Sequence, residues 1–423
     1  MTADYFAEGR FRRKLTSVYP AAMHSRRLPA FQVPITLKKP VRHASHVRYS
    51  NDTIILRCVM DDGSLGWGEG LPRTYVTGES IASVWRHLGK TDFRPLQEMD
   101  FHGALEAALA VDRFELADVA PDDGVNVREC FGNAVRCAVE LAVIDAACRV
   151  EGCSVGDLVC RLPDAAMWAS PQDEVFYSGA ITSMSPARQW LSALRMRLFA
   201  FRQVKVKVGS EGLSDEACLR RVRTIVGNSV DLRLDANEAW RCEEVAGKMA
   251  LLMRFRPTSL EQPVSHADVA GLRHVRTEIA VPIMLDESLC CGEDAVRAIA
   301  GGWCDLFNIR LSKCGGLVRS VRLASLARQH GLGFQLGCQV GETGILSAAG
   351  RHFACSIPDI RYLEGSFDRF LVRDALTEQD LTFRYGGRAG RLAGPGLGID
   401  VDECRVRTLA VRTLELIEPV DLH

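Results

Sequence analysis

The feature that most constrains this chain is a regular alternation of short β-rich runs and helical patterns through its middle. The runs recur roughly every 25 residues, the length of a strand plus a crossover helix. They lie at residues 175–177, 204–208, 232–234, 260, 283–285, 306–309, 333–336 and 361–363. Apolar residues recur three and four positions apart at 317–330 and 343–354, as in helices packed on a sheet. This rhythm predicts the α/β class and a TIM-like, (β/α)8-type barrel.

The segments on either side of this rhythm predict a second, α+β domain. A hairpin is expected where runs at 54–60 and 65–67 flank Asp61, Asp62 and Gly63, followed by helical stretches at 80–88 and 133–150. The tail after about residue 375 lacks the barrel rhythm, so it is expected to return to this domain. The predicted divisions are an N-terminal extension (1–29), a capping domain (30–165), the barrel with the active site (166–375) and a C-terminal segment (376–423).

Composition and charge narrow the class of protein. The net charge of −1 gives no electrostatic reason to expect a nucleic-acid partner. No apolar run is long enough to predict a transmembrane helix, and the basic N-terminal stretch lacks the apolar core of a secretory signal. The fifteen cysteines are scattered without CxxC pairs, which favours reduced thiols and a cytoplasmic location over a disulfide framework or zinc site.

Carboxylates follow three consecutive predicted strands. Asp235 ends the third strand, Glu261 the fourth and Asp286 the fifth. The carboxyl ends of barrel strands meet at one mouth, where this architecture keeps its active sites. Like charges brought so close need a cation, and oxygen ligands without histidine or cysteine select Mg²⁺ or Mn²⁺. The sequence therefore predicts a metal site at this mouth.

Lysines occupy two other strand ends. Lys205 and Lys207 alternate with valines on the second strand, so their side chains share one face. The strand alone also allows an edge with solvated lysines, but the carboxylates on the following strands argue against that alternative. Lys313 follows the sixth strand, which lies across the ring from the second. Lys207 and Lys313 are therefore expected to face each other across whatever the metal holds.

These motifs resemble the enolase superfamily and, within it, the muconate lactonizing enzyme subgroup. The resemblance rests on KVK at 205–207, LDAN at 234–237, LEQP at 260–263, LDES at 285–288 and NIRLSKCGG at 308–316. It covers about residues 30–410 and includes GWGE at 66–69. It implies a (β/α)7β barrel with a capping domain. Arg310 stands where the family commonly has a lysine.

The resemblance also implies roles for individual residues. Asp235, Glu261 and Asp286 would bind Mg²⁺, and Lys207 and Lys313 would act as acid and base. Lys205 would be a neighbouring cation that lowers the pKa of Lys207. Three acidic or amide side chains are expected beside the metal or the substrate: Asn237, Glu287 and Glu342. The implied reaction is removal of the proton next to a substrate carboxylate.

The resemblance leaves the substrate and the outcome of the reaction open. The loop at 72–80, with Tyr75 and Thr77, resembles that of dipeptide epimerases and favours racemisation or epimerisation of a dipeptide or N-acyl amino acid. The eighth strand lacks the paired DxD of those enzymes and supplies only Glu364. A muconate-type cycloisomerase and an o-succinylbenzoate synthase-type dehydratase are the alternatives, and a non-catalytic binding barrel is disfavoured because the lysines and carboxylates are all present.

Partners are expected to be few. The first loop, beginning at Arg42, either receives a second anionic group of the substrate or is a solvated polar loop. A small carboxylate substrate and a homo-oligomer, as is common in the family, are expected; a membrane partner is not.

Overall fold

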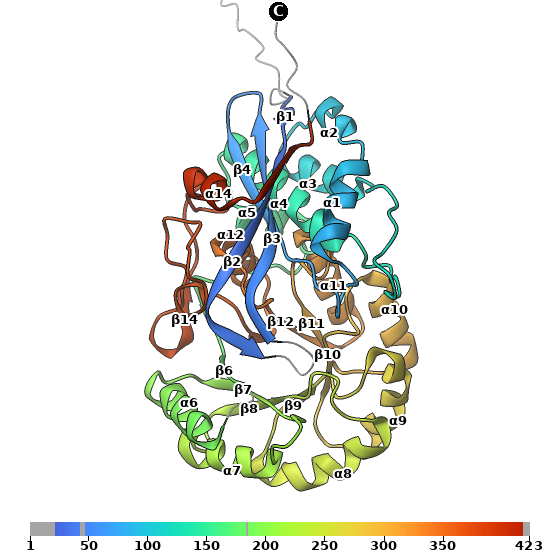
Figure 1. Cartoon of the computed structure of the whole chain (residues 1–423), viewed down its shortest axis with the longest axis vertical. Coiled ribbons are helices and arrows are strands. Elements are labelled where there is room, and N and C mark those ends of the chain that lie inside the picture. Colours follow the sequence, from blue (N-terminus) through green and yellow to red (C-terminus); the bar gives the residue numbers. More distant parts are fainter. Residues whose placement is uncertain (1–21, 43–46, 183–184, 418–423) are drawn as a thin grey trace, which may run out of the picture.

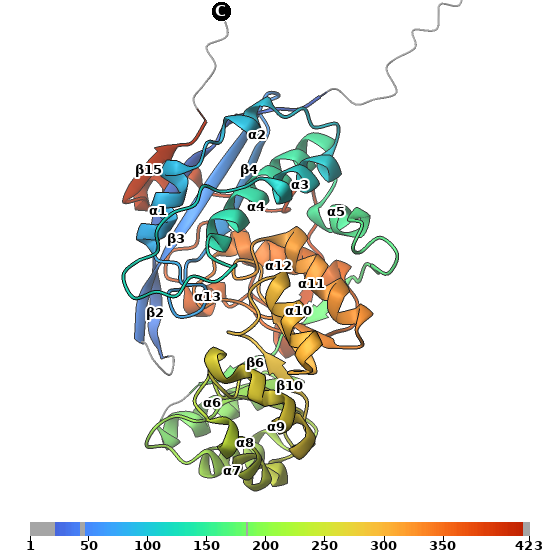
Figure 2. The ribbon, with the colours of Figure 1, turned by 90° about the vertical axis from the view of Figure 1, so that its right-hand side faces the viewer.

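The structure is a computed structural model that describes residues 22–42, 47–182 and 185–417. An antiparallel sheet with its helices forms one layer, and a curled parallel sheet ringed by helices forms the other (Figures 1 and 2). Among the described residues, no helix is both long and apolar enough to cross a membrane.

The parallel sheet confirms the predicted barrel. Its eight strands follow chain order, and a backbone hydrogen bond of 2.7 Å from Ser178 N to Leu363 O joins its first and last segments. The strands are β6 (Gly179–Ile181), β7 (Gln203–Lys207), β8 (Asp231–Asp235), β9 (Ser259–Glu261), β10 (Ile283–Leu285), β11 (Leu306–Ile309), β12 (Gly333–Leu336) and β13 (Ile360–Leu363).

The predicted first barrel strand, residues 175–177, is wrong. Those residues fall largely in β5 (Glu174–Phe176), which pairs antiparallel with β14 (Arg388–Gly390) in a separate ribbon. The first barrel strand is β6, which pairs with β7. The sequence Gly-Ala-Ile of β6 has little β propensity, whereas the Val-Phe-Tyr run before it has more. Propensity alone therefore favoured the wrong segment.

Helices cover the outside of the barrel. They are α6 (Pro186–Leu198), α7 (Asp215–Val226), α8 (Cys242–Leu252), η1 (Met253–Phe255), η2 (His266–Gly271), α9 (Leu272–Glu278), α10 (Gly292–Gly301), α11 (Leu317–Gln329) and α12 (Gly344–Ser356). The short helix α13 (Asp368–Leu371) follows β13 and contacts β2 of the antiparallel sheet. Helical patterns in the sequence at 215–226, 239–254, 267–278, 293–300, 317–330 and 343–354 predict the helices from α7 to α12. They miss α6, whose start is marked only by Ser185 followed by Pro186, a proline suited to the first helical turn.

The second layer combines both ends of the described chain. Strand β15 (Arg412–Glu415) pairs with β2 (Pro29–Arg42), which pairs in turn with β3 (Val47–Met60). The predicted hairpin is confirmed, because β4 (Leu65–Gly70) pairs antiparallel with β3. The remaining elements here are β1 (Ser25–Arg27), α1 (Ile81–Lys90), α2 (Arg94–Glu98), α3 (Ala104–Arg113), α4 (Asn133–Glu151), α5 (Val155–Arg161) and α14 (Glu403–Leu409). The short helix η3 (Tyr385–Gly387) instead lies beside β5 of the separate ribbon.

The predicted N-terminal extension is described only in part. Residues 1–21 of the predicted 1–29 segment lie outside the described residues. Within the remainder, β1 pairs with β3 and belongs to the antiparallel sheet. The other domain boundaries stay predictions.

Three glycines let β4 lie directly against the buried helix α4. A Cβ atom added at Gly68 would lie 1.9 Å from Ala138 O, and one at Gly66 or Gly70 would lie 2.1 or 2.0 Å from the same helix backbone. No side chain fits at such distances, so the alternating glycines set how closely this strand approaches the helix.

Gly68→Ala is therefore expected to lower the free energy of unfolding by about 3 kcal/mol or more, because the strand must move away from α4. Gly89→Ala is the matched control, since Gly89 is in helix α1 and has no atom within 4 Å of the added Cβ. It should stabilise slightly, by about 0.5–1 kcal/mol. Urea denaturation followed by circular dichroism measures both. Equal midpoints for the two variants would contradict the packing argument.

Buried carboxylates of the antiparallel layer accept hydrogen bonds from the first turns of two barrel helices. Glu140 on α4 accepts from the backbone N–H groups of Leu317 and Val318 at the start of α11. Glu69 on β4 accepts from Thr343 N at 2.9 Å and Leu346 N at 3.0 Å at the start of α12. These bonds satisfy helix N-terminal donors and place negative charge where the helix dipole favours it.

Candidate active site

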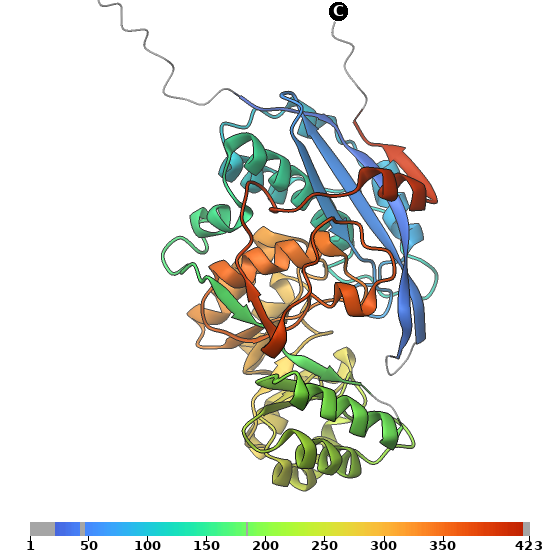
Figure 3. The same ribbon diagram turned by 90° about the vertical axis from the view of Figure 1, so that its left-hand side faces the viewer.

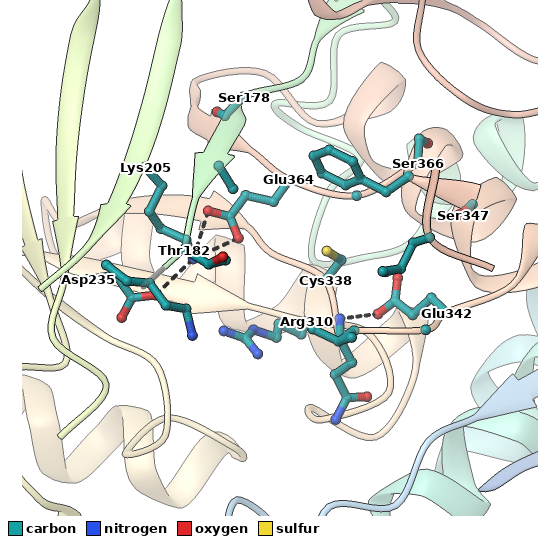
Figure 4. A pocket seen from close by; sticks show the side chains of 18 of the residues that line it. Ser178, Thr182, Lys205, Asp235, Arg310, Cys338, Glu342, Ser347, Glu364 and Ser366 are labelled. Carbon is teal, nitrogen blue, oxygen red and sulfur yellow. Dashed lines mark hydrogen bonds and ion pairs between the residues drawn. The ribbon is translucent and has the colours of Figure 1, made fainter. Parts of the chain in front are cut away.

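A cavity of about 320 Å³ opens at the carboxyl ends of the barrel strands (Figure 4). Strand ends supply its polar wall, and the segment after β13 together with the loop at 72–80 supplies much of the rest. The volume is at the lower end of the range for ligand-binding clefts. Its lining includes Tyr75, Lys205, Lys207, Asp235, Arg310 and Glu364.

The three predicted metal ligands lie at the ends of neighbouring strands. Asp235 on β8 is in register with Glu261 on β9, and Asp286 directly follows β10. All three are at most 1% exposed. As a set their oxygens do not all come within 4.8 Å of one another. The reason is that cationic side chains pack between them.

Lys205 is the first of these cations. Its Nζ lies 3.2 Å from Asp235 Oδ2, 3.3 Å from Glu261 Oε2 and 2.9 Å from Glu364 Oε1, as the dashed lines in Figure 4 indicate in part. Burial by itself would lower the pKa of Lys205, but the three carboxylates outweigh it and hold the pKa well above its ordinary value. Lys205 is thus a fixed positive charge in the floor of the site.

Asp286 binds the second and third cations. Lys313 Nζ donates to Asp286 Oδ1 at 2.8 Å and to its carbonyl oxygen at 2.7 Å, and Arg310 forms an ion pair with Asp286 Oδ2. Burial raises the pKa of Asp286, but Arg310 and Lys313 outweigh it and lower the pKa to about 2. Arg310 also lies 3.8 Å from Glu261.

Glu261 shows why a divalent cation suits this donor set. Burial, together with the charges of Asp235, Glu364 and Asp286, outweighs Lys205 and raises the pKa of Glu261 to about 8. A carboxylate held this way is stabilised by additional positive charge. Three buried carboxylates without a nearby imidazole or thiolate ligand are the donors that Mg²⁺ and Mn²⁺ prefer. The residues present therefore fit the predicted metal.

The two predicted acid/base lysines come from opposite sides of the ring. Lys207 ends β7, the second strand in the order, whereas Lys313 follows β11, the sixth. Lys207 lines the cavity and is partly exposed. Lys313 is 1% exposed, and it also donates a hydrogen bond to Asn308 O at 2.8 Å. The geometry brings both lysines to the carboxylate cluster.

Two arginines of the site were not among the predicted site residues. Arg233 is fully buried on β8, where its Nη2 lies 3.0 Å from Glu364 Oε1. Arg310 binds the predicted metal ligand Asp286. Strand alternation could have predicted Arg233 as a site residue. Arg233 precedes Asp235 by two residues, so the two side chains share one face of the strand.

The other predicted site residues divide into three groups. Asn237 Nδ2 donates to Glu287 Oε1 at 3.3 Å beside the metal ligands, and both residues line the cavity. Glu342 also lines it, accepts from Gln339 N at 2.6 Å, and has its pKa raised to about 8 by burial. Glu364 is the acceptor shared by Lys205 and Arg233.

The loop residues are placed less uniformly. Tyr75 lines the cavity. Thr77 is buried and donates to Arg73 O at 3.2 Å within its own loop, so it stabilises the loop instead of facing the cavity. Arg42 ends β2, but its side chain lies outside what the structure describes.

Another group of possible ligands within the described part of the chain contains Glu129, Cys291 and Asp294. Two of these acids already bind arginines, since Arg297 lies 2.8 Å from both Glu129 and Asp294. The group therefore has its positive charge supplied by the protein. All fifteen cysteines, Cys291 included, are free thiols.

Comparisons with known proteins agree with this geometry. The L-Ala-D/L-Glu epimerase of Bacillus subtilis (strain 168) is 28% identical over 381 residues, covering 88% of this chain and 96% of that enzyme. The N-succinyl Arg/Lys racemase of Bacillus cereus ATCC 14579 has a structure that superposes with a TM-score of 0.80 at 23% identity, covering 93% of this chain and 99% of that one.

A dipeptide epimerase from Enterococcus faecalis V583, solved with Mg and the dipeptide L-Leu-L-Tyr, superposes with a TM-score of 0.76 at 22% identity over 89% of this chain and 99% of that one. The enolase C-terminal domain-like family matches residues 187–405, which span the barrel from α6 and extend to α14. The predicted membership of the enolase superfamily is confirmed: this chain belongs to the enolase C-terminal domain-like family.

Proposed function

We propose that the protein is a Mg²⁺-dependent isomerase that removes and returns the proton next to the carboxylate of a dipeptide or an N-acyl amino acid. The observation that carries the proposal is the placement of Lys207 and Lys313 on opposite sides of a ring whose mouth holds three buried carboxylates. The epimerase and racemase activities named for two of the relatives support it.

Asp235, Glu261 and Asp286 would hold the metal. Mg²⁺ would supply positive charge beside the substrate carboxylate, which makes the adjacent proton more acidic. Mn²⁺ suits the same oxygen donors. The Mg present with a dipeptide in the Enterococcus faecalis structure supports this assignment.

The lysines would then move the proton. A lysine that approaches one face of the α-carbon removes the proton as a neutral amine, and the opposite lysine delivers one to the other face. Lys205 remains charged throughout because three carboxylates hold its proton.

The rest of the cavity would bind the substrate beyond its reacting carbon. Apolar side chains line this part: Val76, Phe367, Phe370 and Leu371. Glu364, the carboxylate at the end of the eighth strand, already neutralises Lys205 and Arg233. The cavity therefore suits an apolar side chain better than an additional unpaired cation.

The test is proton exchange in D₂O with Mg²⁺ present. Dipeptides and N-acyl amino acids are expected to gain deuterium at the α-carbon and lose optical purity, measured by NMR and chiral chromatography. The control is protein treated with EDTA, which should lose exchange and regain it when Mg²⁺ is added. Lactone formation from cis,cis-muconate, without exchange on any amino-acid derivative, would replace this proposal with a cycloisomerase.

We also propose that the protein is cytoplasmic and forms a homo-oligomer. Gel filtration tests its assembly.

A further inference from the structure

A second, larger cavity lies beside the active site. Its volume is about 1150 Å³, and it separates the β2–β3 hairpin from α6 and from the loop that follows β7. Figures 1 and 3 show this hairpin extending from the antiparallel layer toward α6. We refer to this cavity as the α6 groove.

One stripe of helix α6 forms a wall of the α6 groove. Arg188, Leu191 and Arg195 line it and follow one another at the three- and four-residue spacing of a single helix face. Lys39 lines the opposite side, on β2. Arg188, Arg195 and Lys39 are exposed, and none forms an ion pair with another residue that the structure describes.

The charge of the α6 groove is strongly one-sided. Lys39, Arg188 and Arg195 contribute three cations in addition to the acid/base residue Lys207, whereas Glu211 is the carboxylate among the described lining residues. A concave surface lined by one sign of charge concentrates ions of the opposite sign. The chemistry that it would recognise is an anion.

The α6 groove is continuous with the active site. Three residues line both cavities: Thr182, Lys207 and Asn237. A substrate whose reacting carbon lies beside Lys207 can therefore extend directly from the active-site cavity into the α6 groove. The catalytic lysine is the junction between the two cavities.

We propose that the α6 groove binds a second carboxylate of the substrate, carried on an acyl or peptide extension that reaches past Lys207 to Arg188 and Arg195. This inference rests on the proposed function, since it assigns the substrate class of the same site. Arg188 and Arg195 act on binding only, because neither lines the cavity that contains Lys205, Asp235 and Glu364.

The test compares two substrates that differ only in this charge. N-acyl amino acids bearing a dicarboxylic acyl group, in lengths from succinyl to suberoyl, are paired with their terminal methyl esters. The wild-type enzyme is expected to prefer the free acid of at least one length by about fivefold in kcat/KM for each arginine engaged. Arg188→Gln/Arg195→Gln should lose that preference through KM with kcat unchanged, and leave the ester unaffected.

Arg273→Gln is the matched control. Arg273 is an exposed arginine on α9, on the other side of the barrel, and its substitution removes the same charge. This variant should keep the wild-type preference, and added salt should weaken that preference in both proteins. An acid preference that survives in the double variant, or that Arg273→Gln removes equally, would overturn the proposal.

The two proposals fail in different ways. If neither the acids nor the esters exchange their α-proton in D₂O, the proposed function is wrong. If esters and acids exchange equally well at every acyl length in the wild-type enzyme, the proposed function stands and only the role of the α6 groove is wrong.

Discussion

Replacing either Lys207 or Lys313 by alanine is expected to lower kcat for racemisation by about 10²–10⁴-fold, the usual contribution of a positioned acid or base. Racemisation needs both faces of the α-carbon, because the proton leaves from one and returns to the other. The lysines enter from the second and sixth strands of the ring, so one cannot replace the other. Chiral chromatography measures the loss for each variant.

Exchange in D₂O separates the two lysines. Each variant is expected to exchange the α-proton of one enantiomer and to leave the other inert, and the two variants should have opposite preferences. Lys90→Ala, an exposed lysine on α1, should behave as wild type. Near-full racemisation by either catalytic variant would show that the two-lysine mechanism is wrong.

Lys313 needs an additional control, because it is buried and bonded to Asp286 and Asn308. Lys313→Met keeps most of the volume of the side chain while it removes the amine. Circular dichroism establishes that the variant is folded before its activity is measured. A folded Lys313→Met enzyme without turnover assigns the loss to chemistry and not to packing.

Glu364→Gln is expected to lower the free energy of unfolding by about 3–5 kcal/mol at pH 7, measured in EDTA so that no divalent cation contributes. Its carboxylate lies 2.9 Å from Lys205 and 3.0 Å from Arg233, and both cations are buried. Removing the negative charge of Glu364 leaves two buried cations without the carboxylate that they share. Glu243→Gln, which breaks an exposed pair with Arg241, should cost less than about 1 kcal/mol.

The ion pairs of Glu364 with Lys205 and Arg233 also predict that the free energy of unfolding depends on pH. Burial raises the pKa of Glu364, but Lys205 and Arg233 outweigh it and lower the pKa to about 2. A carboxyl group whose pKa is lower in the folded state stabilises the protein above its unfolded value of about 4.5, and this contribution is lost as the pH falls toward 2. The difference between wild type and Glu364→Gln should therefore shrink from pH 5 to pH 2. A constant difference would contradict the ion-pair argument.

The sequence predicts those parts of the protein that depend on local pattern. Strand and helix periods identify seven of the eight barrel strands, and the strand-end position of Asp235, Glu261 and Asp286 places them at one mouth. The assignment of these carboxylates and of the lysines to metal and proton transfer stays a prediction that the variants above would test.

Pairing between distant segments is what sequence pattern could not provide. Residues 174–176 and 179–181 are neighbouring short segments, and only their partner strands, β14 and β7, show which of them belongs to the barrel. The ion pairs of Arg233 and Arg310 depend in the same way on side chains from other strands. Helix α6 was missed because its apolar residues do not form one buried stripe: Trp190, Leu191 and Leu198 are exposed, whereas Gln189 is buried.

The carboxylates that cap barrel helices from the antiparallel layer have a consequence for how substrate enters. Glu140 and Glu69 tie that layer to the first turns of α11 and α12, the helices that follow Lys313 and Glu342. A hinge motion that separated the layers would break these buried hydrogen bonds, at a cost of about 1–3 kcal/mol for each group left unsatisfied. Admission and release of small molecules should therefore depend on local movements of loops at the cavity, such as the one at 72–80, over a rigid frame.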